Sequence, residues 1–373
     1  MHKPGYRKLF KPLIMGRLQL KNRIVMTPLY LGYAALGGKV SPLLLAHYKR
    51  IAQSGAALVI AENASMTPSG STSPRVLRCD HDRYVKGLAR LAGTIKAEKT
   101  LAGLQINHGG SYADVANPRV PSAEVASGKA LHALTRSEIA LIQKQFAKAA
   151  LRVKTAGFDS VELHGSAGYL LSQFVSPRTN KRTDEYGGPL ENRIRFPLET
   201  LQRVKDAVGD FPVGYRLLAD DWLPGGWHIH EAGILATALE KKGADYLSVT
   251  GGSHESASLP EVVQKTRKPG YAVSLAQAVK SAVRLPVITA GRISTPRLAE
   301  SILAAKQADL IGLARNLWLD PDWIIKAREG REAEIITCSP KCHYCAGMVH
   351  AGKPPFCPRW SKKKQNAMKA LFV

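Results

Sequence analysis

The sequence predicts an α/β protein: a (β/α)8 barrel, or TIM barrel, followed by a short cysteine-rich extension. Short apolar segments typical of buried strands recur eight times, and amphipathic helical patterns separate them. Polar side chains follow the ends of these strands, which is where barrels of this class place their functional groups. No G-x-G-x-x-G motif follows any of the strands, so a doubly wound dinucleotide-binding sheet is the weaker interpretation.

The strand segments are nearly continuous in apolar character, as expected of parallel strands that are buried on both faces. In chain order they are RIVMTP near Val25, AALVIAE near Val59, LAGLQI near Gly103, SVELH near Val161, VGYRLL near Tyr215, YLSVTG near Ser248, PVITAG near Ile288 and DLIGLA near Ile311. Thr135 and Glu138 form a capping box that predicts the start of one intervening helix. A barrel needs about 250 residues, so we place the barrel at residues 1–332 and the extension at residues 333–373.

Composition favours a cytoplasmic globular protein. No apolar run approaches the ~20 residues that cross a bilayer, and the basic start of the chain lacks the apolar region and cleavage site of a secretory signal. The formal charge of +24 suits an anionic substrate, an acidic protein partner or nucleic acid. The basic residues are spread along the chain without interleaved aromatics, so specific nucleic-acid binding is the least favoured of these. The oligomeric state is left open, a homo-oligomer included.

Four of the five cysteines, Cys338, Cys342, Cys345 and Cys357, gather near the end of the sequence, whereas Cys79 stands alone. In a reducing compartment such a group indicates metal ligation rather than disulfides. Four thiolates suit both zinc and an iron–sulfur cluster, so spacing alone leaves the two open.

The ends of the last two strands, ITAGRI and GLARNL, each place small residues before an arginine. Exposed backbone N–H groups and a guanidinium at this place in a barrel are typical of a phosphate site. Arg216, on the fifth strand, adds a cation expected to lie deeper, where it would stabilise the reduced form of a flavin. A phosphosugar would explain the phosphate site equally well, but not Arg216.

A second group of polar residues surrounds the fourth strand, which ends at His164 and is followed by Gly165, Gly168 and Tyr169. The run SPRTNKRTDEYGG and the ENRIRF after it resemble the flavin-dependent old yellow enzyme family, as do LKNRIVMTP, LQINHGG, GYRLLADD, AGRI and ADLIGLAR. The resemblance spans roughly residues 9–358. It implies that the central run holds its loop and the next helix in place, and that FMN is the cofactor. The cofactor-binding residues we predict are Thr27, Pro28, Tyr30, Glu62, Gln105, Arg216, Gly291, Arg292, Ala314 and Arg315.

The chain is most similar to the branch that contains 2,4-dienoyl-CoA reductase and trimethylamine dehydrogenase. This likeness implies a [4Fe–4S] cluster on the four cysteines, and it matches Tyr169 and His254 to the acid pair of the reductase. Three departures stand out. Tyr30 replaces the usual small Thr or Cys near the flavin, Ala167 replaces a second carbonyl-binding His or Asn, and the spacing C-x3-C-x2-C-x11-C displaces one cysteine by one residue.

The resulting hypothesis is an FMN-dependent ene-reductase that reduces a C=C bond conjugated to a thioester, such as a CoA thioester, or to another carbonyl. Tyr169 would protonate the substrate, His254 would hold or recharge its hydroxyl, and His164 would contact flavin or substrate oxygen. The alternative is an amine or N-methyl dehydrogenase with an aromatic cage that includes Tyr30, Trp222 and Trp227. The sequence ends shortly after Cys357 with no nicotinamide motif, so we expect a separate acidic electron-transfer protein to exchange electrons through the cluster.

Overall fold

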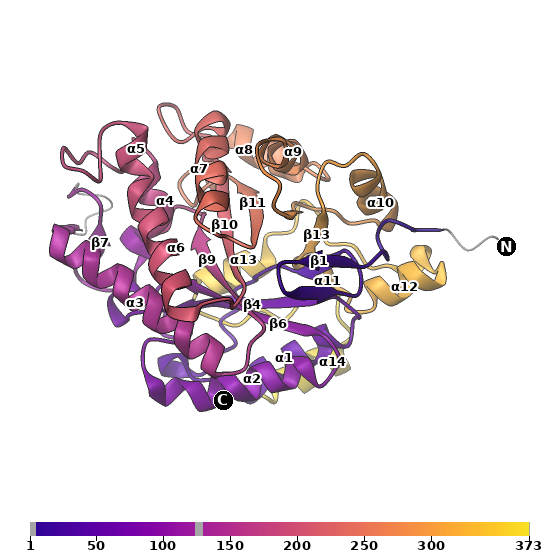
Figure 1. The fold of residues 1–373 in the computed structure, drawn as a ribbon. Helices are drawn as coiled ribbons and strands as arrows, with labels where there is room; N and C mark the ends of the chain where they lie inside the picture. The colour runs from indigo at the N-terminus through magenta and orange to yellow at the C-terminus, as the bar shows by residue number, and fades with distance from the viewer. Residues whose placement is uncertain (1–4, 124–129, 373) are drawn as a thin grey trace.

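The computed structural model describes residues 5–123 and 130–372, and within these ranges the chain forms a closed parallel barrel (Figure 1). The basic start of the chain, which was compared above with a secretory signal, includes residues 1–4, and these lie outside the described residues. The strands pair in the order β3-β13-β12-β11-β10-β9-β6-β4, and β3 pairs with β4 to close the barrel. Their bounds are β3 (Ile24–Met26), β4 (Leu58–Ser65), β6 (Leu101–Asn107), β9 (Ser160–Gly165), β10 (Val213–Asp220), β11 (Tyr246–Gly251), β12 (Val287–Thr289) and β13 (Leu310–Leu313). The predicted barrel and all its strand segments are confirmed.

Helices surround the barrel, in the layer expected of a (β/α)8 protein (Figure 1). The helices after successive strands include α1 (Pro42–Ala52), α2 (Val85–Lys96), α3 (Arg136–Thr155), α6 (Arg195–Val208), α7 (Ile229–Lys241), α9 (Val273–Ala282), α10 (Pro296–Ala304) and α12 (Trp323–Glu329). The predicted capping box is present: the Thr135 side chain accepts from the backbone of Glu138, and the Glu138 side chain accepts from the backbone of Thr135. Among the described residues, we find no helix both long and apolar enough to cross a membrane.

A small hairpin packs at the end of the barrel where the strands begin. Its strands β1 (Leu13–Met15) and β2 (Leu18–Leu20) pair antiparallel. Met15 and Leu20 are fully buried in one apolar cluster with residues from five barrel strands, among them Val25 and Tyr246. Apolar packing therefore fills this end of the barrel, and the polar side chains in the barrel gather toward the opposite end.

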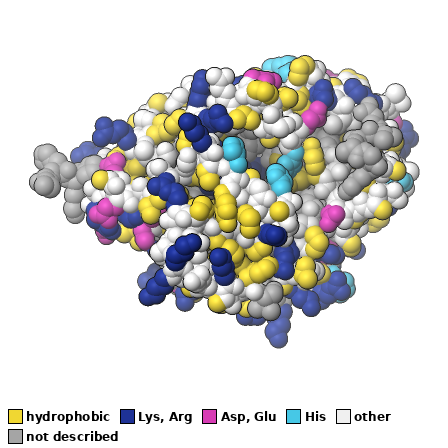
Figure 2. Space-filling model, turned by 180° about the vertical axis from the view of Figure 1, so that it is seen from behind, with side chains coloured by type: hydrophobic (Ala, Val, Ile, Leu, Met, Phe, Trp, Pro, Cys, Tyr) yellow, Lys and Arg dark blue, Asp and Glu magenta, His cyan; other side chains and the backbone are white. Residues whose placement is uncertain are grey.

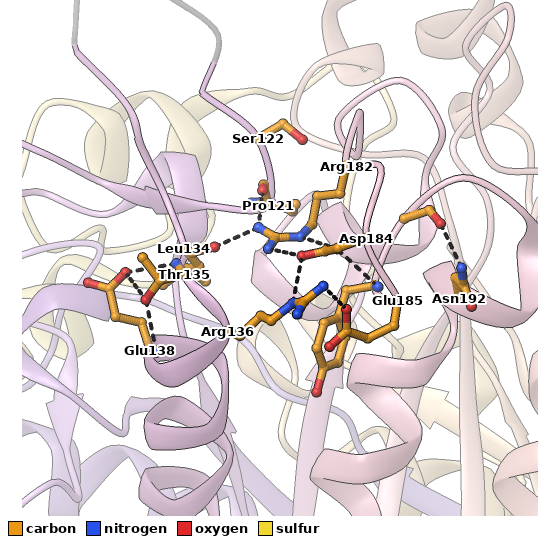
Figure 3. A network of polar contacts seen from close by, with 12 residues as sticks. Pro121, Ser122, Leu134, Thr135, Arg136, Glu138, Arg182, Asp184, Glu185 and Asn192 are labelled. Carbon is orange, nitrogen blue, oxygen red and sulfur yellow. Dashed lines mark hydrogen bonds and ion pairs between the residues drawn. The ribbon is translucent and has the colours of Figure 1, made fainter.

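The central run of the sequence forms a brace between elements at the rim of the barrel (Figure 3). The guanidinium of Arg182 pairs with both oxygens of Asp184 and donates to the carbonyls of Pro121 and Leu134, at 2.8 and 2.6 Å. These carbonyls flank the short strands β7 (Arg119–Val120) and β8 (His132–Ala133). Arg136, at the start of α3, joins the network through Asp184 and Glu185. The structural role inferred for this run is consistent with these contacts.

Residues 335–372 pack against the barrel through aromatic side chains. This part of the chain contains α13 (Tyr344–His350) and α14 (Lys362–Lys369). The Trp360 ring lies 5.1 Å from that of Trp318, which is in α11 (Arg315–Leu319), and its indole N–H donates to the carbonyl of Leu319 at 2.9 Å. The hydroxyl of Tyr33 donates to the carbonyl of Pro355 at 2.5 Å. Segments from both ends of the sequence thus meet on one side of the barrel.

Candidate active site

One cavity brings together most of the residues predicted to bind phosphate. It has a volume of about 230 Å³ and lies at the carboxyl ends of the last barrel strands. Six predicted cofactor residues line it: Thr27, Arg216, Gly291, Arg292, Ala314 and Arg315. Arg267 and Cys338 also line it, and the prediction of this site included neither.

Positive charge concentrates in this cavity. Within the described parts of the chain, no carboxylate forms an ion pair with Arg216, Arg292 or Arg315, and the Arg315 charge is close enough to lower the pKa of Arg292 further, after burial. Gly291 has a φ of 106°, a backbone conformation that favours glycine over other residues. A group of unpaired guanidinium ions around a cavity is suited to a phosphate, so the residues present fit the phosphate end of FMN.

Arg216, predicted to lie deeper than the other cations, is on the barrel strand β10 and lines the same cavity. Burial lowers its pKa, while the Glu162 charge raises it, and its guanidinium donates to the Ser248 hydroxyl at 3.2 Å. Glu162 in turn accepts from the Gln105 amide at 2.7 Å, and burial raises its pKa to about 7. Its second carboxyl oxygen is buried without a partner. Arg216 is therefore not neutralised by a direct ion pair. Its positive charge is available to stabilise the reduced flavin ring that the prediction places beside it.

Tyr169 and His254 approach each other although their positions in the sequence differ by 85. Their ring centroids are 5.1 Å apart, and the His164 ring centroid lies 4.9 Å from that of Tyr169. The loops that carry Tyr169 and His254 are joined by a parallel bridge between Ala167 and Ser253, and the His254 backbone N–H donates to the Ala167 carbonyl at 3.0 Å. The structure thus brings the three predicted catalytic residues together, whereas their roles stay predictions.

The protein environment favours the neutral forms of all three side chains. Burial raises the pKa of Tyr169 well above its ordinary value. Burial also lowers the pKa of His164, with a smaller effect of the Arg216 charge. The pKa of His254 is lowered first by desolvation and then by His350 of α13. At neutral pH the arrangement therefore holds a protonated phenol near two neutral imidazoles.

Tyr112, which the sequence analysis did not single out, completes this ring cluster. It lies in η4 (Gly110–Tyr112), and its ring centroid is 4.8 Å from His254 and 6.1 Å from Tyr169. It also lines a second cavity of about 470 Å³ that begins beside the cluster. Figure 2 shows one face of the molecule, which is hollowed and has histidine side chains at the rim of the hollow. The sequence feature that could have identified Tyr112 is its position in LQINHGGSY, just after the end of a predicted strand.

Other predicted residues lie outside the lining of both cavities. The Tyr30 hydroxyl donates to Ser73 at 2.8 Å, and Pro28 beside it is half-buried. Glu62 is fully buried, and burial raises its pKa to about 8, so the carboxyl is protonated at neutral pH. One oxygen of Glu62 has no partner. The cofactor roles of Pro28, Tyr30, Glu62 and Gln105 stay predictions.

The two tryptophans suggested for an aromatic cage are placed differently. Trp227 is fully buried, where its indole N–H donates to the carbonyl of Leu218 at 2.8 Å. Trp222 is half-buried, and the ammonium of Lys265 lies 4.6 Å from its ring centroid. Trp227 therefore cannot reach a ligand without unpacking the core, and Trp222 already has a cation against its ring.

The four C-terminal cysteines are free thiols, with Cys357 buried and the other three half-buried. The charges of Cys338, Cys342 and Cys345 each raise the pKa of Cys357, after burial, so the four lie near one another. Nevertheless, the described residues include no group of three or more metal-ligating side chains arranged to hold a metal ion. The thiols thus gather in one region without forming a ligand set, and we assign no reaction step to a cluster.

Comparison with known proteins gives a consistent picture. Residues 8–334 match the model of the NADH:flavin oxidoreductase / NADH oxidase family. The chain is 42% identical over 356 residues to a metal reductase of Desulforamulus reducens, covering 94% of this chain and 53% of that protein.

Two solved structures are also similar. One is a 2-naphthoyl-CoA reductase in complex with 2-naphthoyl-CoA, with a TM-score of 0.91, 28% identity and coverage of 97% of this chain and 58% of that chain. The other is histamine dehydrogenase from Rhizobium sp. 4-9, with a TM-score of 0.85, 28% identity and coverage of 94% and 52%. The chain thus spans little more than half the length of these relatives. Because the family model matches most of the sequence, the chain belongs to the NADH:flavin oxidoreductase / NADH oxidase family, whose members are FMN-dependent oxidoreductases.

Proposed function

We propose that this protein is an FMN-dependent reductase of C=C bonds conjugated to a thioester or another carbonyl group. The observation that carries the proposal is the cluster of Tyr169, His254 and His164, in which burial keeps the phenol protonated and the charge of Arg216, a residue of the arginine-rich cavity, acts on His164. When bound, FMN would supply hydride chemistry at its N5 position. The similarity to a 2-naphthoyl-CoA reductase supports a thioester substrate.

In this proposal each residue has a distinct role. Arg292 and Arg315 bind the phosphate, and Arg216 stabilises negative charge deeper in the site. Tyr169 delivers its proton to the α-carbon of the acceptor as negative charge develops there. His254, neutral at the working pH, orients the Tyr169 hydroxyl and relays a replacement proton to it, taking up a solvent proton on its other ring nitrogen. His164 donates to an oxygen of the flavin or of the substrate.

The test is a visible spectrum of the purified protein through one redox cycle. The protein is reduced with dithionite without oxygen and then mixed with a 2-enoyl thioester. We expect the oxidised flavin absorbance to return at a rate that depends on acceptor concentration. If several enoyl and enone acceptors leave the flavin reduced, the proposal is rejected.

The likeness to histamine dehydrogenase favours one alternative, oxidation of an amine by the same site. The positions of Trp222 and Trp227 speak against a cage built from those two rings, because one is buried in the core and the other faces Lys265. In the same spectral experiment, this alternative requires an amine substrate to bleach the oxidised flavin.

We propose further that Cys338, Cys342, Cys345 and Cys357 bind a [4Fe–4S] cluster. Support comes from their proximity and from the place of Cys338 in the lining of the arginine-rich cavity. Protein purified without oxygen should contain about four iron and four acid-labile sulfide per chain. Cys342→Ser should lower both values, whereas Cys79→Ser, a buried thiol outside the group, should not. One zinc ion per chain without sulfide would contradict the cluster.

An acidic electron-transfer protein is the partner that we propose for this region. Residues 335–373 contain no Asp or Glu, but they include Lys341, Lys353, Arg359, Lys362 and Lys363, all exposed. Opposite charges raise the association rate of transient redox partners. The positive charge of residues 335–373 is the observation that supports an acidic partner.

A further inference from the structure

We infer that the 470 Å³ cavity beside Tyr169 binds the uncharged, mainly apolar tail of the molecule that the site reduces. The inference rests on the proposed function and adds a substrate class to it. A volume of this size is within the range of ligand pockets, about 300–1,000 Å³.

The cavity is lined by chain neighbours of the proposed proton donor and of its partner His254. Gly168 and Ser253, which line it, are the chain neighbours of Tyr169 and His254. The Tyr112 ring lines it as well and packs on the His254 ring. A substrate whose reacting carbon is near the Tyr169 hydroxyl can therefore extend its remaining atoms past Tyr112 into this cavity.

Most polar groups in the cavity wall, apart from the Nε atom of Arg178, are already bonded within the protein. The Ser172 hydroxyl donates to the Tyr169 carbonyl at 2.8 Å, and the Thr179 hydroxyl donates to the Gln173 carbonyl at 2.6 Å. Asp221 accepts from the backbone N–H groups of Leu223 and Trp227 and from the Ser176 hydroxyl. A polar ligand would lose its bonds to water here and gain few in return, at a net cost.

Two of the three charged side chains in the wall form an ion pair with each other, and burial raises the pKa of the third, Asp221. Arg178 pairs with Glu255, so neither group is free to bind an ion of opposite charge. The Nε atom of Arg178 is buried without a partner, so the wall retains one free hydrogen-bond donor. By contrast, Arg216, Arg267, Arg292 and Arg315 all line the other cavity. We thus assign anion binding to the arginine-rich cavity and binding of the uncharged substrate tail to the 470 Å³ cavity.

Apolar side chains supply the remaining contact surface. Val120, Leu218 and Leu223 line the cavity, and all three are buried. Burying a hydrocarbon chain against them contributes about 0.8 kcal/mol per methylene, which corresponds to a roughly fourfold gain in affinity for each added carbon. Affinity should therefore rise with chain length for neutral ligands.

The experiment is a calorimetric titration of the flavin-loaded protein with 1-octanol, octanoate and octylamine, and with 1-butanol for chain length. We expect octanol to bind at least tenfold more tightly than either charged compound and than butanol. Leu223→Trp, which fills the cavity, should weaken octanol binding at least tenfold. The matched control is Leu141→Trp, because Leu141 is 53% exposed on α3, and octanol affinity should be unchanged.

Octanoate or octylamine binding as tightly as octanol would overturn the inference, as would octanol binding that is unaffected by Leu223→Trp. If that variant does not fold, Leu131→Trp fills the cavity from another wall, and the comparison of butanol with octanol needs no variant. Neither readout requires turnover. If octanol binds but enoyl acceptors do not reoxidise the flavin, the proposed function is rejected and the inference about the cavity is kept. If enoyl acceptors reoxidise the flavin but octanol does not bind, only the inference about the cavity is rejected.

Discussion

Tyr169→Phe is expected to slow reoxidation of the reduced flavin by an enoyl acceptor by roughly a hundredfold or more, while flavin binding and reduction by dithionite persist. The substitution removes one hydroxyl and keeps the ring that packs against His164 and His254. A general acid typically contributes about 10²–10⁴-fold to a rate, so the loss should be large. Rapid mixing of the reduced protein with acceptor measures it directly.

The pH dependence of this rate distinguishes Tyr169 from a conventional histidine acid. Because burial raises the pKa of Tyr169, the phenol keeps its proton throughout the neutral and moderately alkaline range. Because the pKa of His254 is lowered, its cationic form is absent near neutral pH. The wild-type rate should therefore remain level between about pH 7 and 9, where a histidine acid would lose its proton.

The matched control is Tyr84→Phe, which alters a hydroxyl that donates to the Gly37 carbonyl outside the site. This variant should reoxidise at the wild-type rate. An unchanged rate in Tyr169→Phe would remove the phenol from the mechanism and make His254 the next candidate.

Arg315→Ala is expected to release most of the flavin. A hydrogen bond to a charged group contributes about 1.5–3 kcal/mol, and a guanidinium can form two to a phosphate. We therefore expect flavin affinity to fall by at least tenfold, measured by fluorescence titration of the flavin-free protein with FMN. Riboflavin, which lacks the phosphate, should bind both forms equally.

Arg90→Ala is the control for Arg315→Ala, because Arg90 is an exposed cation on α2. Its variant should retain FMN at the wild-type level. A parallel loss of riboflavin and FMN affinity in Arg315→Ala would indicate a structural defect rather than the loss of a phosphate contact. FAD instead of FMN in the purified protein would contradict the cofactor assignment itself.

The barrel could be predicted because its determinants are local. Each strand is a short apolar run that is buried on both faces, and the helix over Arg136–Thr155 is preceded by its own capping box. The hairpin β1–β2 was not predicted, since three-residue strands are too short to show a period. Its role in closing one end of the barrel depends on contacts with five strands from across the sequence.

Parts of the site were predictable for a different reason. Residues at the carboxyl ends of parallel strands must meet at one end of the barrel, so Arg216, Arg292 and Arg315 could be grouped from their order alone. Arg267 could not, because it ends the inserted helix α8 (Pro260–Arg267), whose path over the barrel no strand determines. The contact between Tyr112 and His254 likewise depends on the geometry of two loops.

The division of the site into two cavities with no lining residue in common has a consequence for how this protein can change over time. Substitutions at Val120, Leu131 or Leu223 alter one cavity and leave the arginines of the other in place. The range of acceptor molecules can therefore change over time while cofactor binding is kept. Selection for a new acceptor need not oppose selection for cofactor binding. For the same reason, a laboratory library restricted to these three positions should yield altered acceptor ranges in variants that still purify yellow.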